Sequence, residues 1–151
     1  SPNPRHQEDL VRIRHCFPAL ALLLALSSPA AAQDFSKFSL DVPQGWTAST
    51  GEEGTVAVIA PKNEAAVTIA IEKLEDLSPE EVVRIFAREL GAGEPQKTAD
   101  GEYSFQYVRN GVSHRSIFRA RKDHFLLITV SDEAGKHRES IEGMLKSLKE
   151  K

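Results

Sequence analysis

The chain has 151 residues, a formal net charge of −3, and 40% hydrophobic and 27% charged residues. These values are typical of a soluble globular protein and exclude a disordered or fibrous chain. Acidic and basic residues are interleaved, so no long-range field favours a nucleic acid or an anionic membrane, and we expect no nucleic-acid partner. The single cysteine, Cys16, lies near the amino terminus, which excludes thiol chemistry from the rest of the chain.

The amino-terminal part has the pattern of a secretory signal. A basic start over residues 12–15 precedes an apolar run over residues 19–26, which ends at a Ser-Ser-Pro break. A helix that crosses a membrane needs about 20 apolar residues, so this run is too short to remain as an anchor. We expect no stable membrane insertion once the signal is cleaved.

The predicted cleavage position follows from small side chains. Ala30 and Ala32 suit the shallow pockets of a signal peptidase, which places the cut before Gln33. The sequence therefore predicts a leader and cleavable signal over residues 1–32, followed by one domain over residues 33–151. Its expected location is periplasmic or secreted.

The start of the predicted domain alternates between apolar and polar residues. Residues 38–42 have the period of a strand, and a Pro-Gln-Gly turn then leads into a second strand at Trp46. Two more strands are predicted over residues 55–60 and 66–74. We expect these segments to form an antiparallel meander.

A helix start follows the meander. Ser78 is a preferred N-cap, Pro79 suits the first helical position, and Glu81 completes a capping box. Gly91 supplies the left-handed stop. The pattern predicts a helix over residues 79–90 with one apolar stripe.

The strongest hairpin signal is Asn110-Gly111, because both residues tolerate a positive φ. It joins predicted strands over residues 103–109 and 112–121. A two-residue turn also fixes which residues of the two strands lie opposite each other.

This register divides the hairpin into two faces. Tyr107 is predicted opposite His114 on one face, with Phe105 opposite Ser116 and Tyr103 opposite Phe118. On the other face Gln106 is predicted opposite Arg115, Ser104 opposite Ile117 and Glu102 opposite Arg119.

The last part of the chain predicts a strand and a helix. Residues 125–130 are almost entirely apolar, which favours a central strand that is buried on both faces. From about Glu133 the apolar spacing predicts a terminal helix, capped by Ser131 or Asp132 and ending in lysines up to Lys151. The expected fold class is α+β, with a single antiparallel sheet of about six to eight strands and two helices packed on it.

Candidate binding residues lie on the hairpin and at one turn: Trp46, Tyr107, His114, Arg115, Arg119 and Arg121. A structural interpretation is favoured for each of them. Trp46 is expected to plug one end of the core, and His114 to be a neutral, core-directed imidazole. The arginines are expected to form a solvated face that is offset by nearby carboxylates, since exposed ion pairs contribute only about 0–1 kcal/mol.

No motif for catalysis, metal binding or cofactor binding stands out. Ser113 and His114 are adjacent on a strand, so their side chains point to opposite faces and cannot act together as nucleophile and base. His114, His124 and His137 lack the short spacings of metal ligands. We therefore expect no enzyme activity, no metal and no cofactor.

The segment from Phe38 to Trp46 (FSLDVPQGW) resembles the opening of the PsbP-like superfamily, in which an alternating strand runs into Pro-x-Gly-Trp. The capped helix after a four-strand meander also matches, so the resemblance covers most of residues 35–148. The superfamily includes luminal extrinsic proteins of photosystem II, a nuclear Ran-binding relative and DcrB-like bacterial envelope proteins, which are mostly not enzymes. The resemblance implies an α/β/α sandwich and carries no catalytic residues across.

Three functional hypotheses follow. The leading one is an exported, non-enzymatic binding or accessory module of the cell envelope, acting as a monomer or weak dimer on an unidentified envelope protein. The alternative is a small-ligand carrier or unrecognised hydrolase with a cleft near His114, Tyr107 and Arg115. A third is an adaptor that presents an exposed strand edge to its partner.

Overall fold

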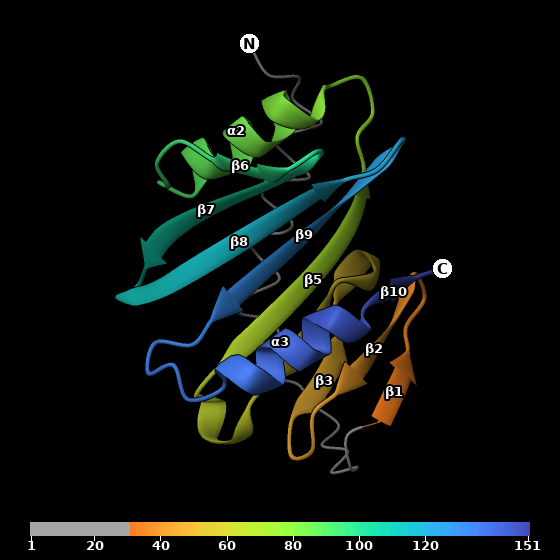
Figure 1. Ribbon diagram of the computed structural model, residues 1–151, viewed down its shortest axis with the longest axis vertical. Helices are drawn as coiled ribbons and strands as arrows, with labels where there is room; N and C mark the ends of the chain where they lie inside the picture. Colours follow the sequence, from red (N-terminus) through yellow and green to blue (C-terminus); the bar gives the residue numbers. More distant parts are fainter. Residues whose placement is uncertain (1–30) are drawn as a thin grey trace.

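The computed structural model describes residues 31–151, which form two sheets and two α-helices (Figure 1). In chain order the elements are β1 (Ala31–Asp34), β2 (Phe38–Val42), β3 (Thr47–Thr50), the 3₁₀ turn η2 (Glu52–Gly54), β4 (Val56–Ile59), η3 (Pro61–Asn63), β5 (Ala66–Lys73), α2 (Pro79–Glu89), β6 (Gln96–Ala99), β7 (Glu102–Arg109), β8 (Val112–Ala120), β9 (His124–Ser131), α3 (Arg138–Ser147) and β10 (Lys149–Glu150). The predicted α+β class, with two helices on a large antiparallel sheet, is confirmed.

The large sheet has seven antiparallel strands in the order β3-β4-β5-β9-β8-β7-β6. The apolar strand β9 lies at its centre, as predicted, because its residues are buried on both faces. Ile128 and Val130 belong to one hydrophobic core, whereas Phe125 and Leu127 belong to the other. The sheet therefore has a separate core on each face.

One of these cores lies beneath α2. The capping box is present: the Ser78 hydroxyl accepts from the Glu81 amide at 3.2 Å, and a Glu81 carboxylate oxygen accepts from the Ser78 amide at 3.1 Å. The apolar stripe of the helix is buried, and Phe86 meets Phe125 edge-on with ring centroids 5.7 Å apart. Each side chain buried in this way contributes about 1.5–3 kcal/mol.

The other core lies beneath α3 and the small sheet. Ile141 and Met144 of α3 are buried together with Phe38 and Leu40 of β2. Figure 1 shows α3 in front of the large sheet, beside β2 and β10, while α2 lies at the upper end of the molecule. The layers form the expected α/β/α sandwich, with the small sheet β1-β2-β10 sharing the layer of α3.

The β7–β8 hairpin has the predicted turn and register. Asn110 and Gly111 both have a positive φ, of 52° and 76°. All six predicted cross-strand pairs are present, from Tyr107 opposite His114 to Glu102 opposite Arg119. The turn residues thus determine which side chains share a face.

The prediction for the terminal helix is wrong at both ends. Residues 133–137 form a turn and loop, in which the Gly135 amide donates to the Asp132 carbonyl at 3.0 Å and Gly135 has a φ of 67°. The helix begins at Arg138 and ends at Ser147. Lys149 and Glu150 instead form β10, which pairs with β2 and completes the small sheet.

The predicted opening meander also needs correction. The strand over Phe38–Val42 does not pair with β3 but lies between β1 and β10 in the small sheet. Only β3, β4 and β5 form the meander. The strands β1, β6 and β10 were not predicted, because they are short and polar or exposed and lack an apolar alternation.

The signal-peptide prediction lies mostly outside the described residues, and Ala30 with it. The predicted cut between Ala32 and Gln33 falls within β1, where Gln33 pairs with Leu40 of β2. Cleavage there would leave Gln33 and Asp34 to continue the pairing. Over residues 31–151 no helix is both long enough and apolar enough to cross a bilayer.

Candidate functional site

A cleft of about 780 Å³ lies between α3 and the outer half of the large sheet. Strands β7, β8 and β9 form one wall, and the loop before α3 together with α3 forms the other. Its lining comprises Gln106, Tyr107, Val108, Ser113, His114, Arg115, Val130, Asp132, Glu133, Gly135, Arg138, Ile141 and Glu142.

Strand alternation explains which hairpin residues face the cleft. Gln106 lies opposite Arg115, and Arg115 lies opposite Val130, so these three share the face that α3 covers. Val108 and Ser113 form the next pair toward the turn on the same face. The register fixed by the hairpin turn therefore builds the sheet wall.

Val108 differs from the other residues of this wall because it is apolar and yet exposed. It is 66% exposed, and no other large hydrophobic residue within residues 31–151 is exposed. Ile141, on the facing helix, is buried at the base of the cleft, as is Val130. Aliphatic side chains thus lie both at the base and at the rim of the cleft.

Charged groups occupy the facing wall. The loop and α3 contribute the carboxylates of Asp132, Glu133 and Glu142 and the guanidinium of Arg138. A carboxylate oxygen of Glu133 accepts from the Ser113 amide at 3.2 Å, which ties the loop to the tip of the hairpin. This contact joins the two walls of the cleft.

Asp132 has one satisfied and one unsatisfied carboxylate oxygen. Its Oδ2 accepts from the His137 amide at 3.1 Å, which holds the loop before α3. Its Oδ1 is buried and has no hydrogen-bond partner in the described part of the chain. A buried acceptor without a donor costs about 1–3 kcal/mol, and more when it is charged.

Tyr107 and His114 stand on the opposite face of the hairpin from Arg115. Their rings stack with centroids 4.9 Å apart and an interplanar angle of 18°. Burial lowers the pKa of His114, with a further contribution from Arg109, and burial raises the pKa of Tyr107. Tyr107, His114 and Arg115 all line the cleft, as the alternative hypothesis expects. Only Arg115, however, lies on the face of the sheet that α3 covers.

The other two candidate arginines lie away from the cleft. Arg119 donates from Nε to Glu102 Oε2 at 3.1 Å, the pairing that the register predicts. Arg121 donates from Nε to Glu150 Oε2 at 2.7 Å. Both guanidinium groups are offset by carboxylates and do not form a patch with Arg115.

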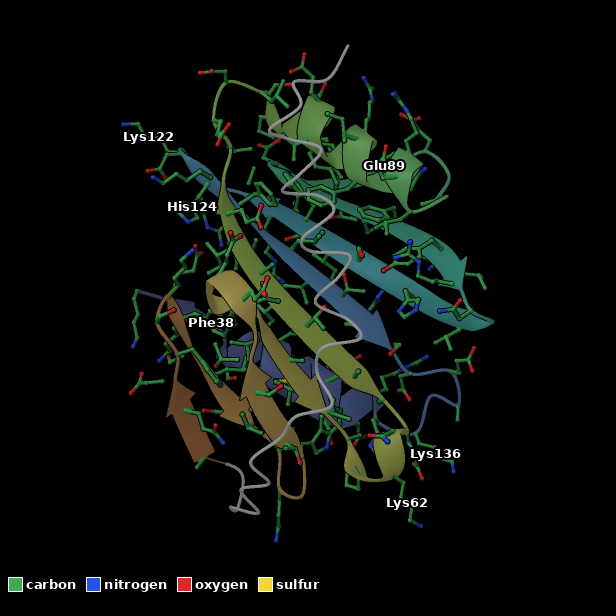
Figure 2. The ribbon with its side chains drawn as sticks, turned by 180° about the vertical axis from the view of Figure 1, so that it is seen from behind. Phe38, Lys62, Glu89, Lys122, His124 and Lys136 are labelled. Carbon is green, nitrogen blue, oxygen red and sulfur yellow. The ribbon has the colours of Figure 1, made fainter. Side chains whose placement is uncertain are left out.

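A second charged cluster, the clasp, consists of Arg121, Asp123, His124 and Glu150. His124 bonds through Nδ1 to Asp123 at 2.7 Å and through Nε2 to Glu150 at 2.8 Å. These hydrogen bonds, that to Asp123 first, raise the pKa of His124. Figure 2 shows His124 near Lys122 at the β8–β9 turn, far from Lys136 in the loop before α3.

Trp46 is 4% exposed and belongs to the core beneath α3, which agrees with a plug. Its ring meets His137 edge-on at a centroid distance of 5.4 Å. His137 in turn bonds through Nε2 to Glu64 at 3.1 Å, and this hydrogen bond is the main reason that the pKa of Glu64 is lowered. Trp46 thus supports the loop that carries Asp132.

Sequence reasoning missed several residues of the cleft. Asp132 was considered only as a helix cap and Glu133 only as the approximate start of the terminal helix, while Arg138 and Glu142 fell inside that helix without a predicted role. Their signal was the Gly135 after Asp132, which marks a turn. Across residues 31–151 no three metal-ligating side chains gather into a metal site.

One outer strand of the large sheet is open but poorly suited to pairing. All four residues of β6 are exposed, and its register with β7 shifts between Lys97 and Ala99. A lysine and an irregular register both hinder the addition of another strand. The cleft is therefore the better candidate for a binding surface.

Comparisons with known proteins give a fold. No protein-family model matches the sequence, and no curated protein matches it. The solution structure of cyanobacterial PsbP (CyanoP) from Synechocystis sp. PCC 6803 is similar, with a TM-score of 0.51 and 12% identity, over 87% of this chain and 99% of that one. The fold is PsbP-like.

A second solved structure, from Bacteroides thetaiotaomicron VPI-5482, matches with a TM-score of 0.49 and 16% identity. The match covers 83% of this chain and 47% of that chain, so the present chain spans about half the length of that protein. The similarity to CyanoP confirms the PsbP-like part of the resemblance at the level of the fold. The relation to Ran-binding and DcrB-like proteins stays a prediction.

Proposed function

We propose that this protein is an exported, non-enzymatic binding module that holds a partner protein of the cell envelope in the cleft between α3 and the β7–β8 hairpin. The observation that carries the proposal is the cleft itself, about 780 Å³ in volume, with the exposed Val108 at its rim. Binding sites are concave and combine apolar lining with a few placed polar groups. The PsbP-like fold supports an accessory role, because the superfamily consists mostly of proteins that are not enzymes.

The chemistry of the cleft supports binding over catalysis. Ser113 and His114 lie on opposite faces of β8, so the hydroxyl has no imidazole beside it to act as a base. The charged side chains that face the cleft are carboxylates and guanidinium groups, which suit recognition. The export step is supported by the basic start and the apolar run of residues 1–32.

Site-specific photo-crosslinking in the cells of origin tests this proposal. A photoreactive amino acid is placed at Glu142, on the rim of the cleft, and separately at Lys122 as a control. We expect one defined envelope-protein adduct from the Glu142 position and none of the same mass from Lys122. Identical adducts from both positions, or none from Glu142, would count against a partner in the cleft.

A small-ligand carrier is the second candidate. The cleft volume of about 780 Å³ favours it, since small-molecule sites measure about 300–1,000 Å³. Native mass spectrometry of the protein purified from its own cells distinguishes the two. A bound compound of fixed mass supports a carrier, whereas ligand-free protein that still crosslinks through Glu142 supports the protein partner.

A further inference from the structure

We infer that the cleft recognises a basic side chain, lysine or arginine, that stands next to an aliphatic residue in a short segment of the partner protein. This inference rests on the proposed function and adds the chemistry of the segment. Three observations on different residues carry it: the charge of the α3 wall, the unsatisfied oxygen of Asp132, and the exposed side chain of Val108.

The α3 wall attracts a cation. It carries three carboxylates, those of Asp132, Glu133 and Glu142, against the single guanidinium of Arg138, a formal charge of 1 − 3 = −2, and Arg115 on the sheet wall brings the whole lining to 2 − 3 = −1. Between walls of low dielectric such a charge acts more strongly than it would on an open surface. An acidic segment would meet repulsion from this wall.

Asp132 supplies a specific acceptor within the wall. Its Oδ1 has no donor within the part of the chain that the structure describes, while its Oδ2 accepts from the His137 amide. Because Oδ1 is buried, a ligand reaches it only if the carboxylate rotates about its terminal torsion, which is broad in aspartate. An ammonium or guanidinium group then provides the missing donor, and hydrogen bonds between ionised groups are about twice as strong as neutral ones.

The aliphatic surface accommodates the rest of the segment. Val130 and Ile141 line the base, and Val108 stands at the rim with 66% of its surface exposed. Lysine and arginine lay their methylene stems along apolar surface while the charged head reaches a polar partner. A neighbouring aliphatic residue of the segment then covers Val108.

The sheet wall favours a polypeptide over a free amine. Gln106 and Arg115 face the cleft from β7 and β8 and offer amide and guanidinium donors. A main chain that lies between the walls has carbonyl oxygens for these donors, which a simple amine lacks. Both walls are therefore used only when the cation is part of a peptide.

Nuclear magnetic resonance titration of the ¹⁵N-labelled full chain tests the inference. The probes are three blocked tetrapeptides: acetyl-Gly-Val-Lys-Gly-amide, the same peptide with Glu in place of Lys, and the same peptide with Ser in place of Val. We expect the amide signals of Gln106, Ser113 and Glu142 to shift with the first peptide. The affinity for the glutamate peptide should be at least about tenfold lower.

Two variants make the test specific. Asp132→Asn retains an oxygen that accepts from the His137 amide but removes the negative charge. It should lower the affinity for the lysine peptide about tenfold. Asp100→Asn, at an exposed turn beside Lys97, should leave its affinity unchanged. If Asp132→Asn fails to fold, Glu142→Gln serves in its place, because Glu142 is exposed on α3.

The outcomes separate the inference from the proposed function. Equal binding of the lysine and glutamate peptides, or no shifts in the cleft with either, overturns the basic-segment inference. A partner adduct from the Glu142 position would then still support the proposed function. Preference for the lysine peptide without any adduct in cells would instead support the site chemistry and contradict a protein partner.

Discussion

The clasp and the cleft are charged clusters of residues 31–151 that differ in how well their polar groups are hydrogen-bonded. In the clasp, His124, Arg121 and Glu150 are joined by hydrogen bonds of 2.7–2.8 Å. In the cleft, Asp132 Oδ1 has no donor among residues 31–151, and Val108 is exposed. Satisfied charges hold structure together, whereas unsatisfied polar groups gain by binding a partner, so we assign the clasp a structural role and propose the cleft as the binding site.

The largest effect is expected from breaking the layer that supports both clusters. Met144 is buried between α3 and the small sheet, so Met144→Ala should lower the free energy of unfolding by about 2–5 kcal/mol. Chemical denaturation measures this change. Glu139→Ala, on the exposed side of the same helix, is the control and should change stability by less than about 0.5 kcal/mol. An equal loss in both would contradict the assigned packing.

A smaller loss of stability is expected when the clasp is broken. Glu150→Ala removes the acceptor of both Arg121 and His124 and should cost about 1–2 kcal/mol, since these groups remain partly exposed. Thermal and denaturant unfolding both report it. Lys149→Ala, next to it in β10, should be nearly neutral, and a large effect there would show that the strand rather than the clasp is responsible.

The two histidines should make stability depend on pH in opposite directions. The pKa of His124 is raised above 6.5, so its contribution is complete below pH 6.5 and is lost as the pH rises through the folded value. The pKa of His114 is lowered, so its contribution is present above pH 6.5 and is lost as the pH falls.

Denaturation curves of His124→Gln and His114→Gln over this pH range separate the two effects. His124→Gln should remove the loss of stability at rising pH, and His114→Gln should remove the loss at falling pH. If His124→Gln leaves the decline above pH 6.5 intact, the clasp does not have the electrostatic role assigned to it.

The smallest effect on stability, and a large one on binding, is expected at Val108. Val108→Lys removes the exposed aliphatic surface and adds a cation where a basic segment is proposed to dock. Stability should change by no more than about 1 kcal/mol, the span of strand propensities at an exposed site. A substantial loss of stability would assign Val108 to the fold and remove it from the binding surface.

The fold was largely predictable where local chemistry is strong. The Asn110-Gly111 turn determined the hairpin register, the Ser78 capping box located α2, and the apolar run of β9 placed that strand at the centre. The small sheet could not be predicted, because the pairing of β10 with β2 joins the two ends of the domain through backbone contacts that leave little trace in the side chains.

The cleft was predictable only in part. The hairpin register correctly separated Arg115 from Tyr107 and His114, and the expected hollow near them is present. Its acidic wall depends on where α3 begins, and the turn at Gly135 moved that start to Arg138. The position of α3 in the fold, which local sequence does not specify, thus determines which charged side chains line the cleft.

The most direct test of the binding site is photo-crosslinking from Glu142 with and without the Val108→Lys substitution. The two positions line the same cleft from α3 and from β7. We predict a defined envelope-protein adduct in the parent chain and its loss, at unchanged protein level, in the Val108→Lys chain. An adduct of undiminished yield in the Val108→Lys chain would contradict the assignment of the cleft as the binding site.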